Sequence, residues 1–154
     1  MKTKTFWRCL AFAVTALFLA AACEDSDNVS PVIDLEEPAD GDTLRIGAGV
    51  HFEMDLSDNE ALKSYRVAFH DNFDGHGHDS RADEETISFT YDRSWDVSGK
   101  KSTHVHHHDI IIAANATPGP YHMEVYCTDA SGNEAYLVRD VVLSHEGGED
   151  DDED

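Results

Sequence analysis

The chain has 154 residues, of which 11 are Lys or Arg, 32 are Asp or Glu and 10 are His, so its formal net charge is -21. This length corresponds to a single domain. The acidic excess excludes a protein that binds nucleic acid through its phosphates, because that affinity comes mainly from Lys and Arg. Charge-driven binding to an anionic membrane surface is disfavoured for the same reason.

Residues 1–22 have the features of a secretory signal peptide. Three basic residues precede an apolar run from Cys9 to about Leu19, and three alanines follow. The apolar run is shorter than the roughly 20 residues of a membrane-spanning helix, and no second such run follows in the sequence. These residues are therefore expected to direct export and then to be removed.

The three alanines lead directly into Cys23, and this arrangement resembles the lipobox of bacterial lipoproteins, with Ala at the position where Leu is usual. The resemblance implies cleavage before Cys23 and lipidation of that cysteine. Cleavage at an ordinary Ala-x-Ala site, with Cys23 left as a free thiol, is the alternative. Residues 24–28, Glu-Asp-Ser-Asp-Asn, resemble the surface-export signal of Bacteroidetes lipoproteins. The expected location is the outer membrane, lipid-anchored and facing the cell surface, with residues 23–30 as an acidic linker.

Residues 31–144 alternate between apolar and polar side chains in short runs that are separated by turn residues, a pattern typical of strands. The pattern predicts an all-β immunoglobulin-like β-sandwich of about seven strands. Tyr121 is the candidate tyrosine-corner residue of this fold. Cys127, with no disulfide partner left in the domain, is predicted to be a small buried hydrophobe. The strands are predicted at residues 32–35, 43–46, 50–57, 64–70, 87–91, 110–112, 121–128 and 135–143.

The end of the chain, residues 145–154, is strongly acidic and has no apolar side chain to bury. It is predicted to be a disordered tail. It lacks the spacing of a calcium-binding EF-hand loop, so its expected role is to attract cations weakly.

Seven of the ten histidines lie in two windows, residues 70–78 and 104–108. Neutral imidazole suits zinc and copper, and neighbouring carboxylates complete or orient such sites. The predicted strands at residues 64–70 and 121–128 normally pair antiparallel in such a sandwich, which places His70 beside His122. The predicted first metal site therefore contains His70, His76, His78 and His122, with Asp74 or Asp71 as neighbours.

The second window contains His104, His106 and His108 in alternation. Strict continuation of this alternation would place them on the same side as Ile110 and Ile112 and would bury them, so a break near residues 108–109 is expected. With such a break, His106 and His108 either join the first site or form a second one. His51 and His145 are expected to be ordinary surface residues.

The sequence as a whole resembles a family of small Bacteroidetes lipoproteins with one immunoglobulin-like domain of unknown function. The resemblance is carried by residues 64–67 leading into His70, by residues 73–78 and by residues 119–122. It implies the fold and the location but no activity.

The function expected from the residues is non-enzymatic binding of zinc or copper, in which the metal is either captured beside an outer-membrane transporter or held as part of the structure. Signatures of common hydrolases and of phosphate-binding loops are absent from the sequence. The alternative is an adhesion or accessory module that binds a protein or a glycan, with Trp95 and Tyr126 as exposed aromatic anchors.

Overall fold

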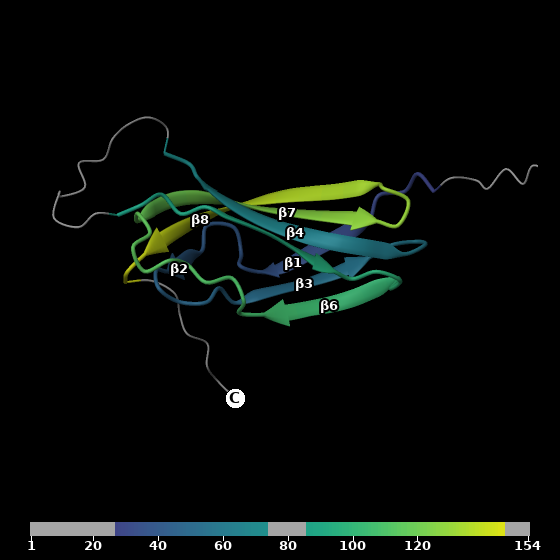
Figure 1. Cartoon of the computed structure of the whole chain (residues 1–154), viewed down its shortest axis with the longest axis horizontal. Coiled ribbons are helices and arrows are strands. Elements are labelled where there is room, and N and C mark those ends of the chain that lie inside the picture. Colours follow the sequence, from purple (N-terminus) through teal and green to yellow (C-terminus); the bar gives the residue numbers. More distant parts are fainter. Residues whose placement is uncertain (1–26, 74–85, 147–154) are drawn as a thin grey trace, which may run out of the picture.

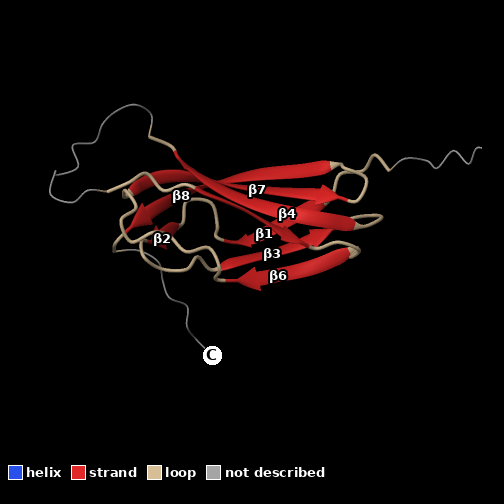
Figure 2. Cartoon of the chain, in the orientation of Figure 1, coloured by secondary structure: helices blue, strands red, loops and turns tan. Residues whose placement is uncertain are grey.

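The computed structural model describes residues 27–73 and 86–146. All regular structure in this part of the chain is β-strand (Figure 2), and the described residues include no helix that could cross a membrane. The eight strands are β1 (Val32–Glu37), β2 (Thr43–Arg45), β3 (Phe52–Ser57), β4 (Leu62–Asp71), β5 (Tyr91–Asp96), β6 (Ser102–His107), β7 (Gly119–Asp129) and β8 (Glu134–Ser144).

The strands form two sheets that pack face to face (Figure 1). The smaller sheet has the order β1-β3-β6 and the larger one has the order β2-β8-β7-β4-β5. All neighbours are antiparallel except β2 and β8, which are parallel. The all-β sandwich predicted from the alternation is thus confirmed, with three strands in one layer and five in the other.

Side chains from the inner faces of both sheets form one continuous core. The alternating rows predicted for β3, β4 and β7 all point into it, because apolar residues two positions apart lie on one face of a strand. Cys127 is fully buried, as predicted. Burial, followed by the nearby charges of Asp58 and Asp129, raises the pKa of its thiol to about 11. The three rows are Phe52, Met54 and Leu56, then Tyr65, Val67 and Phe69, then Tyr121, Met123, Val125 and Cys127.

Tyr121 forms the predicted tyrosine corner at the start of β7. Its hydroxyl donates a hydrogen bond to the carbonyl oxygen of Thr117 at 2.9 Å, four residues upstream. The same oxygen accepts the N–H of Phe89 at 3.1 Å. One buried side chain therefore satisfies two backbone groups of the loops that flank the larger sheet.

Two strands lie elsewhere than the sequence pattern predicted. The predicted strand at residues 87–91 is replaced by β5, which begins at Tyr91, and the one at residues 110–112 is replaced by β6, which ends at His107. Ile110 and Ile112 are buried, but their segment makes only an isolated bridge between Ile111 and Gly49. In this segment the apolar residues correctly predict burial but not a strand.

Candidate metal centre

His70 on β4 and His122 on β7 are direct partners in the larger sheet, as the antiparallel pairing predicted. Both side chains point away from the core. Nε2 of His70 lies 3.2 Å from Nδ1 of His122, and the two rings meet edge to face. Two nitrogens bound tetrahedrally to one zinc ion at 2.0–2.1 Å lie about 3.3 Å apart. The two nitrogens are thus hydrogen-bonded to each other, and their separation also suits a shared ion.

A carboxylate lies near the outer nitrogen of each ring, at hydrogen-bond distance only for His122. Nε2 of His122 lies 3.0 Å from an oxygen of Asp140 on β8, and Nδ1 of His70 lies 4.0 Å from an oxygen of Glu124 on β7. A carboxylate on the far nitrogen fixes the orientation of a metal-binding histidine and makes it a stronger ligand. The other members of the predicted first site, Asp74, His76 and His78, lie outside the described residues.

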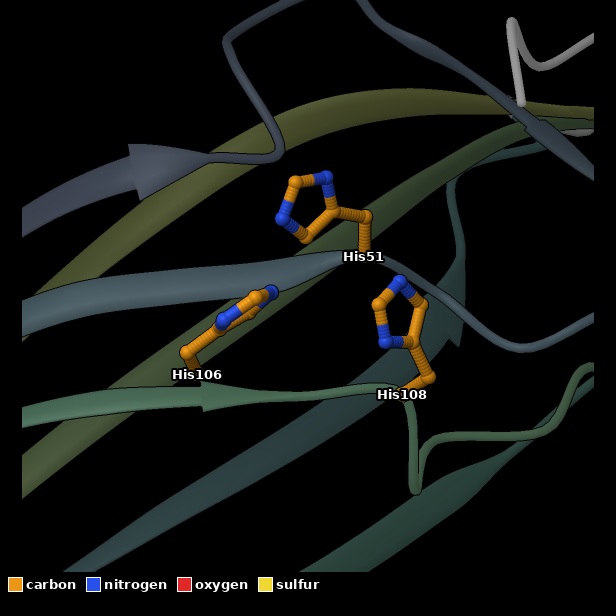
Figure 3. A group of neighbouring side chains, drawn as sticks. All are labelled: His51, His106 and His108. Atoms are coloured by element: carbon orange, nitrogen blue, oxygen red, sulfur yellow. The ribbon is translucent and has the colours of Figure 1, made fainter. Parts of the chain in front are cut away.

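His106 and His108 do not join His70 and His122. They lie on the outer face of the smaller sheet, where they meet His51, the residue that precedes β3 (Figure 3). The ring centres of His51 and His106 are 5.0 Å apart, and those of His51 and His108 are 5.1 Å apart. Because the two sheets turn their outer faces in opposite directions, the two histidine groups are separate candidate sites.

The backbone register explains this second group. Phe52 is paired with His107 across β3 and β6, so His51 and His106 share the opposite face of the sheet. The chain leaves β6 after His107, which is the break expected near residues 108–109, and it brings the ring of His108 beside that of His51. His51, which was expected to be an ordinary surface residue, is half-buried and in ring contact with His106 and His108, whereas His145 is exposed as expected.

One nitrogen from each of His51, His106 and His108 lies within 4.8 Å of the others. Zinc would bring these atoms to about 3.3 Å, a change that small rotations of surface side chains can supply. Nε2 of His51 is buried and has no hydrogen-bond partner, and an oxygen of Glu53 lies 3.6 Å from it. The group thus offers three imidazoles, one free buried nitrogen and one adjacent carboxylate.

The remaining histidines of the second window have other partners. His104 lies between two acids, with Nε2 3.3 Å from Glu53 and Nδ1 3.1 Å from Asp55. His107 points inward and stacks on Phe52 and Trp95, with ring centres 5.1 Å apart in both pairs. Burial lowers the pKa of His107, and the positive charge of Arg93 adds to this effect while Asp109 opposes it.

Trp95 is not the exposed anchor that was expected. It is half-buried between Tyr65, at 4.8 Å between ring centres, and His107, and the guanidinium of Arg93 lies over it at 4.9 Å. Tyr126 is also half-buried, under Arg66 and beside Tyr136. The two residues that sequence reasoning missed, His51 and Glu53, are visible in the sequence only as polar positions of an alternating strand.

Comparison with known proteins gives a family but no activity. The family model described as "Domain of unknown function (DUF4625)" matches residues 20–144, which is most of the chain. A comparison with curated proteins finds no match.

Proposed function

Because this chain belongs to the DUF4625 family, whose function is unknown, its function has to be argued from its own residues, and we propose that it binds a transition metal, zinc or copper, through surface histidines. In this proposal the protein is a non-enzymatic lipoprotein of the outer membrane, anchored through Cys23 and facing the cell surface. It captures metal beside an outer-membrane transporter or holds it as part of its own structure.

The observation that carries the proposal is the convergence of His51, His106 and His108, where a buried Nε2 has no hydrogen-bond partner. A buried polar atom without a partner is costly, and a metal ion would satisfy it. Glu53 is placed to act as a fourth ligand or to orient His51. Three imidazoles with a carboxylate or water form a common zinc environment.

The pair of His70 and His122 gives independent support on the other sheet. Two nitrogens 3.2 Å apart, each ring backed by a carboxylate, form half of a tetrahedral site. His76, His78 and Asp74 are the proposed sources of the missing ligands. In this arrangement each outer face of the sandwich carries one metal site.

Titration of the full chain, purified without a polyhistidine tag, with zinc and with copper tests this proposal. We expect each metal to bind with a dissociation constant below about 10 μM, since structural and transport sites of this ligand type bind at least that tightly. His51→Asn and His108→Asn should each weaken binding at the group of His51, His106 and His108 by tenfold or more, and His70→Asn should remove one equivalent from the other face.

His145→Asn is the matched control, because His145 is exposed and belongs to neither group. His104→Asn tests whether metal binding depends only on the number of histidines on the smaller sheet. Binding weaker than about 10 μM, or equal loss in all variants, contradicts the proposal. Loss of the chain from the membrane fraction in Cys23→Ser, with retention in Cys127→Ser, tests the anchor separately.

A protein or glycan partner is the alternative, and one observation favours it. The outer face of the larger sheet carries Arg66 over the ring of Tyr126, which lies 4.7 Å from that of Tyr136, and Tyr136 is 51% exposed. Such tyrosine and arginine clusters are frequent in binding surfaces. Under this alternative, the metal titrations fail while Tyr136→Ala abolishes adhesion.

A further inference from the structure

We propose that Asp27, Asp58 and Asp129 bind a calcium ion at the end of the sandwich opposite the histidines. The three residues come from three separate segments. Asp27 precedes β1, Asp58 directly follows β3 and Asp129 is the last residue of β7. The turn after β3, the turn after β7 and the N-terminal segment meet at this end of the molecule (Figure 1). This site is distinct from both histidine groups, which lie at the starts of β3 and β7 and the ends of β4 and β6.

The carboxylates lie close enough to share one ion. One oxygen from each residue lies within 4.8 Å of the other two. Calcium binds oxygen at 2.3–2.6 Å, so two oxygens on one ion are at most about 5 Å apart. The three oxygens therefore satisfy the distance condition without rearrangement of the loops.

The orphaned oxygens of two of these residues point independently to a ligand. Oδ2 of Asp27 and Oδ2 of Asp58 are both buried and have no hydrogen-bond partner. Buried acceptors are almost always satisfied, and leaving a charged one unpaired is especially costly. A water, a proton or a cation could satisfy one such atom, and a single calcium ion would satisfy both at once.

Hydrogen bonds to the other oxygens fix the orientation of these side chains. Oδ1 of Asp27 accepts the N–H of Val29 and the amide of Asn59, both at 3.0 Å. Oδ1 of Asp58 accepts the N–H groups of Glu60 and Ala61 at 2.9 and 2.7 Å. Each carboxylate is thus held by one oxygen, and the other oxygen is left free.

Asp129 is the most enclosed member, with none of its surface exposed. Asn133 holds it, with its backbone N–H 2.8 Å from Oδ1 and its amide 2.6 Å from Oδ2.

Cations of the described residues do not pair with this cluster. None of the ion pairs found within residues 27–73 and 86–146 includes any of the three carboxylates. Oxygen-only ligands select a hard cation and not zinc or copper. Calcium is favoured over magnesium, because it accepts irregular geometry and a mixed set of carboxylates, carbonyls and waters.

Calcium at this position would attach the N-terminal segment to the domain. The amide of Asn133 already donates to the carbonyl oxygen of Asp27 at 3.2 Å, so the segment, the turn after β3 and the turn after β7 share one polar network. An affinity in the range of extracellular calcium modules, about 10⁻⁴ to 10⁻³ M, is expected. The site would be filled outside the cell, where calcium is abundant, and would be empty at low calcium.

Thermal unfolding and calorimetry of the chelator-treated full chain with calcium alone test the proposal. At 5 mM calcium we expect the Tm to rise by about 5 °C above its value in sodium chloride of equal ionic strength. Asp58→Asn and Asp27→Asn keep the size of the side chain and should each weaken calcium binding by tenfold or more. Without calcium, the same variants should unfold at a higher temperature than the wild type, because they remove one charge from the cluster.

Asp34→Asn is the matched control, since Asp34 is an exposed acid on β1 away from the cluster, and it should respond to calcium like the wild type. Absence of a calcium-specific rise in the wild type overturns the proposal. The proposal is also overturned if calcium raises the Tm of both cluster variants as much as it raises that of the wild type. That result would assign the effect to the acidic tail or to general screening. The use of two variants keeps the test decisive if one of them folds poorly, and zinc-free buffer keeps the result independent of the histidine sites.

Discussion

At the scale of single residues, Tyr121 is a buried side chain that links two loops to the start of a strand. Its hydroxyl bonds to Thr117 and Phe89, both within or beside irregular loops. Its ring is fully buried and meets that of Phe73 edge to face at 5.4 Å. The residue therefore fixes the entry into β7, the strand that carries His122.

Tyr121→Phe should lower the free energy of unfolding by about 1 to 3 kcal/mol, because it leaves two backbone groups without a partner while the ring still fills the core. Urea unfolding measures the change. Tyr136→Phe is the control, since the hydroxyl of Tyr136 bonds to Glu124 on an exposed face, and a change below about 0.5 kcal/mol is expected there. Equal losses in the two variants would contradict this role of the tyrosine corner.

The candidate site residues were predictable only where strand pairing follows from the fold. His70 and His122 lie on the two strands that pair centrally in such sandwiches, so their contact was predicted. The contact between His51 and the second histidine window depends on the exact register of β3 against β6, which alternation alone does not fix. The cluster of Asp27, Asp58 and Asp129 was not predicted at all, because these residues lie in three segments that are far apart in sequence.

At the scale of elements, β5 and β6 explain why two predicted strands were misplaced. The inward row of β6 contains Val105 as its only fully apolar member, beside Thr103 and His107, so hydrophobic alternation scarcely marks it. β5 is an edge strand that pairs only with β4 and is largely charged or polar. Charged edge strands resist pairing with other chains, but they lack the apolar signal that predicts a strand.

β6 also carries the histidine whose protonation opposes folding. The N–H of Asp109 donates to Nδ1 of His107 at 3.3 Å, so the proton of the neutral ring is on Nε2, which lies 3.1 Å from the hydroxyl of Tyr65. A positive charge here would lie among Phe52, Tyr65 and Trp95. Burial therefore lowers the pKa of His107 from its ordinary value of 6.5.

Because the unfolded chain takes up this proton first, His107 should make the protein less stable as the pH falls below 6.5, and it should have no effect at higher pH. NMR titration of the ring protons should give a pKa below 6.5. His107→Gln should reduce the loss of stability between pH 7 and pH 5, whereas His145→Gln should leave it unchanged. An unchanged pH dependence in His107→Gln would contradict the assignment.

At the scale of the whole molecule, the net charge of -21 opposes folding. Like charges repel more strongly in the compact state, and the screening length falls from about 10 Å at 0.1 M salt to about 3 Å at 1 M. Raising sodium chloride from 0.05 to 0.5 M should therefore raise the Tm by about 2 to 5 °C. Asp34 and Glu36 are two exposed positions on β1. In a variant with both Asp34→Lys and Glu36→Lys, the same increase in salt should raise the Tm by less than in the wild type. A Tm that falls with added salt would contradict this view.

The parallel pairing of β2 and β8 has a mechanical consequence. The described chain enters at one end of the sandwich and leaves at the other, after β8 (Figure 1). If one end is fixed and the other is pulled, the load is directed along β2 and β8. Their hydrogen bonds, which join Thr43, Leu44 and Arg45 to the last residues of β8, lie across the direction of force and must break together. β2 and the last strand, β8, thus form a clamp that resists shear.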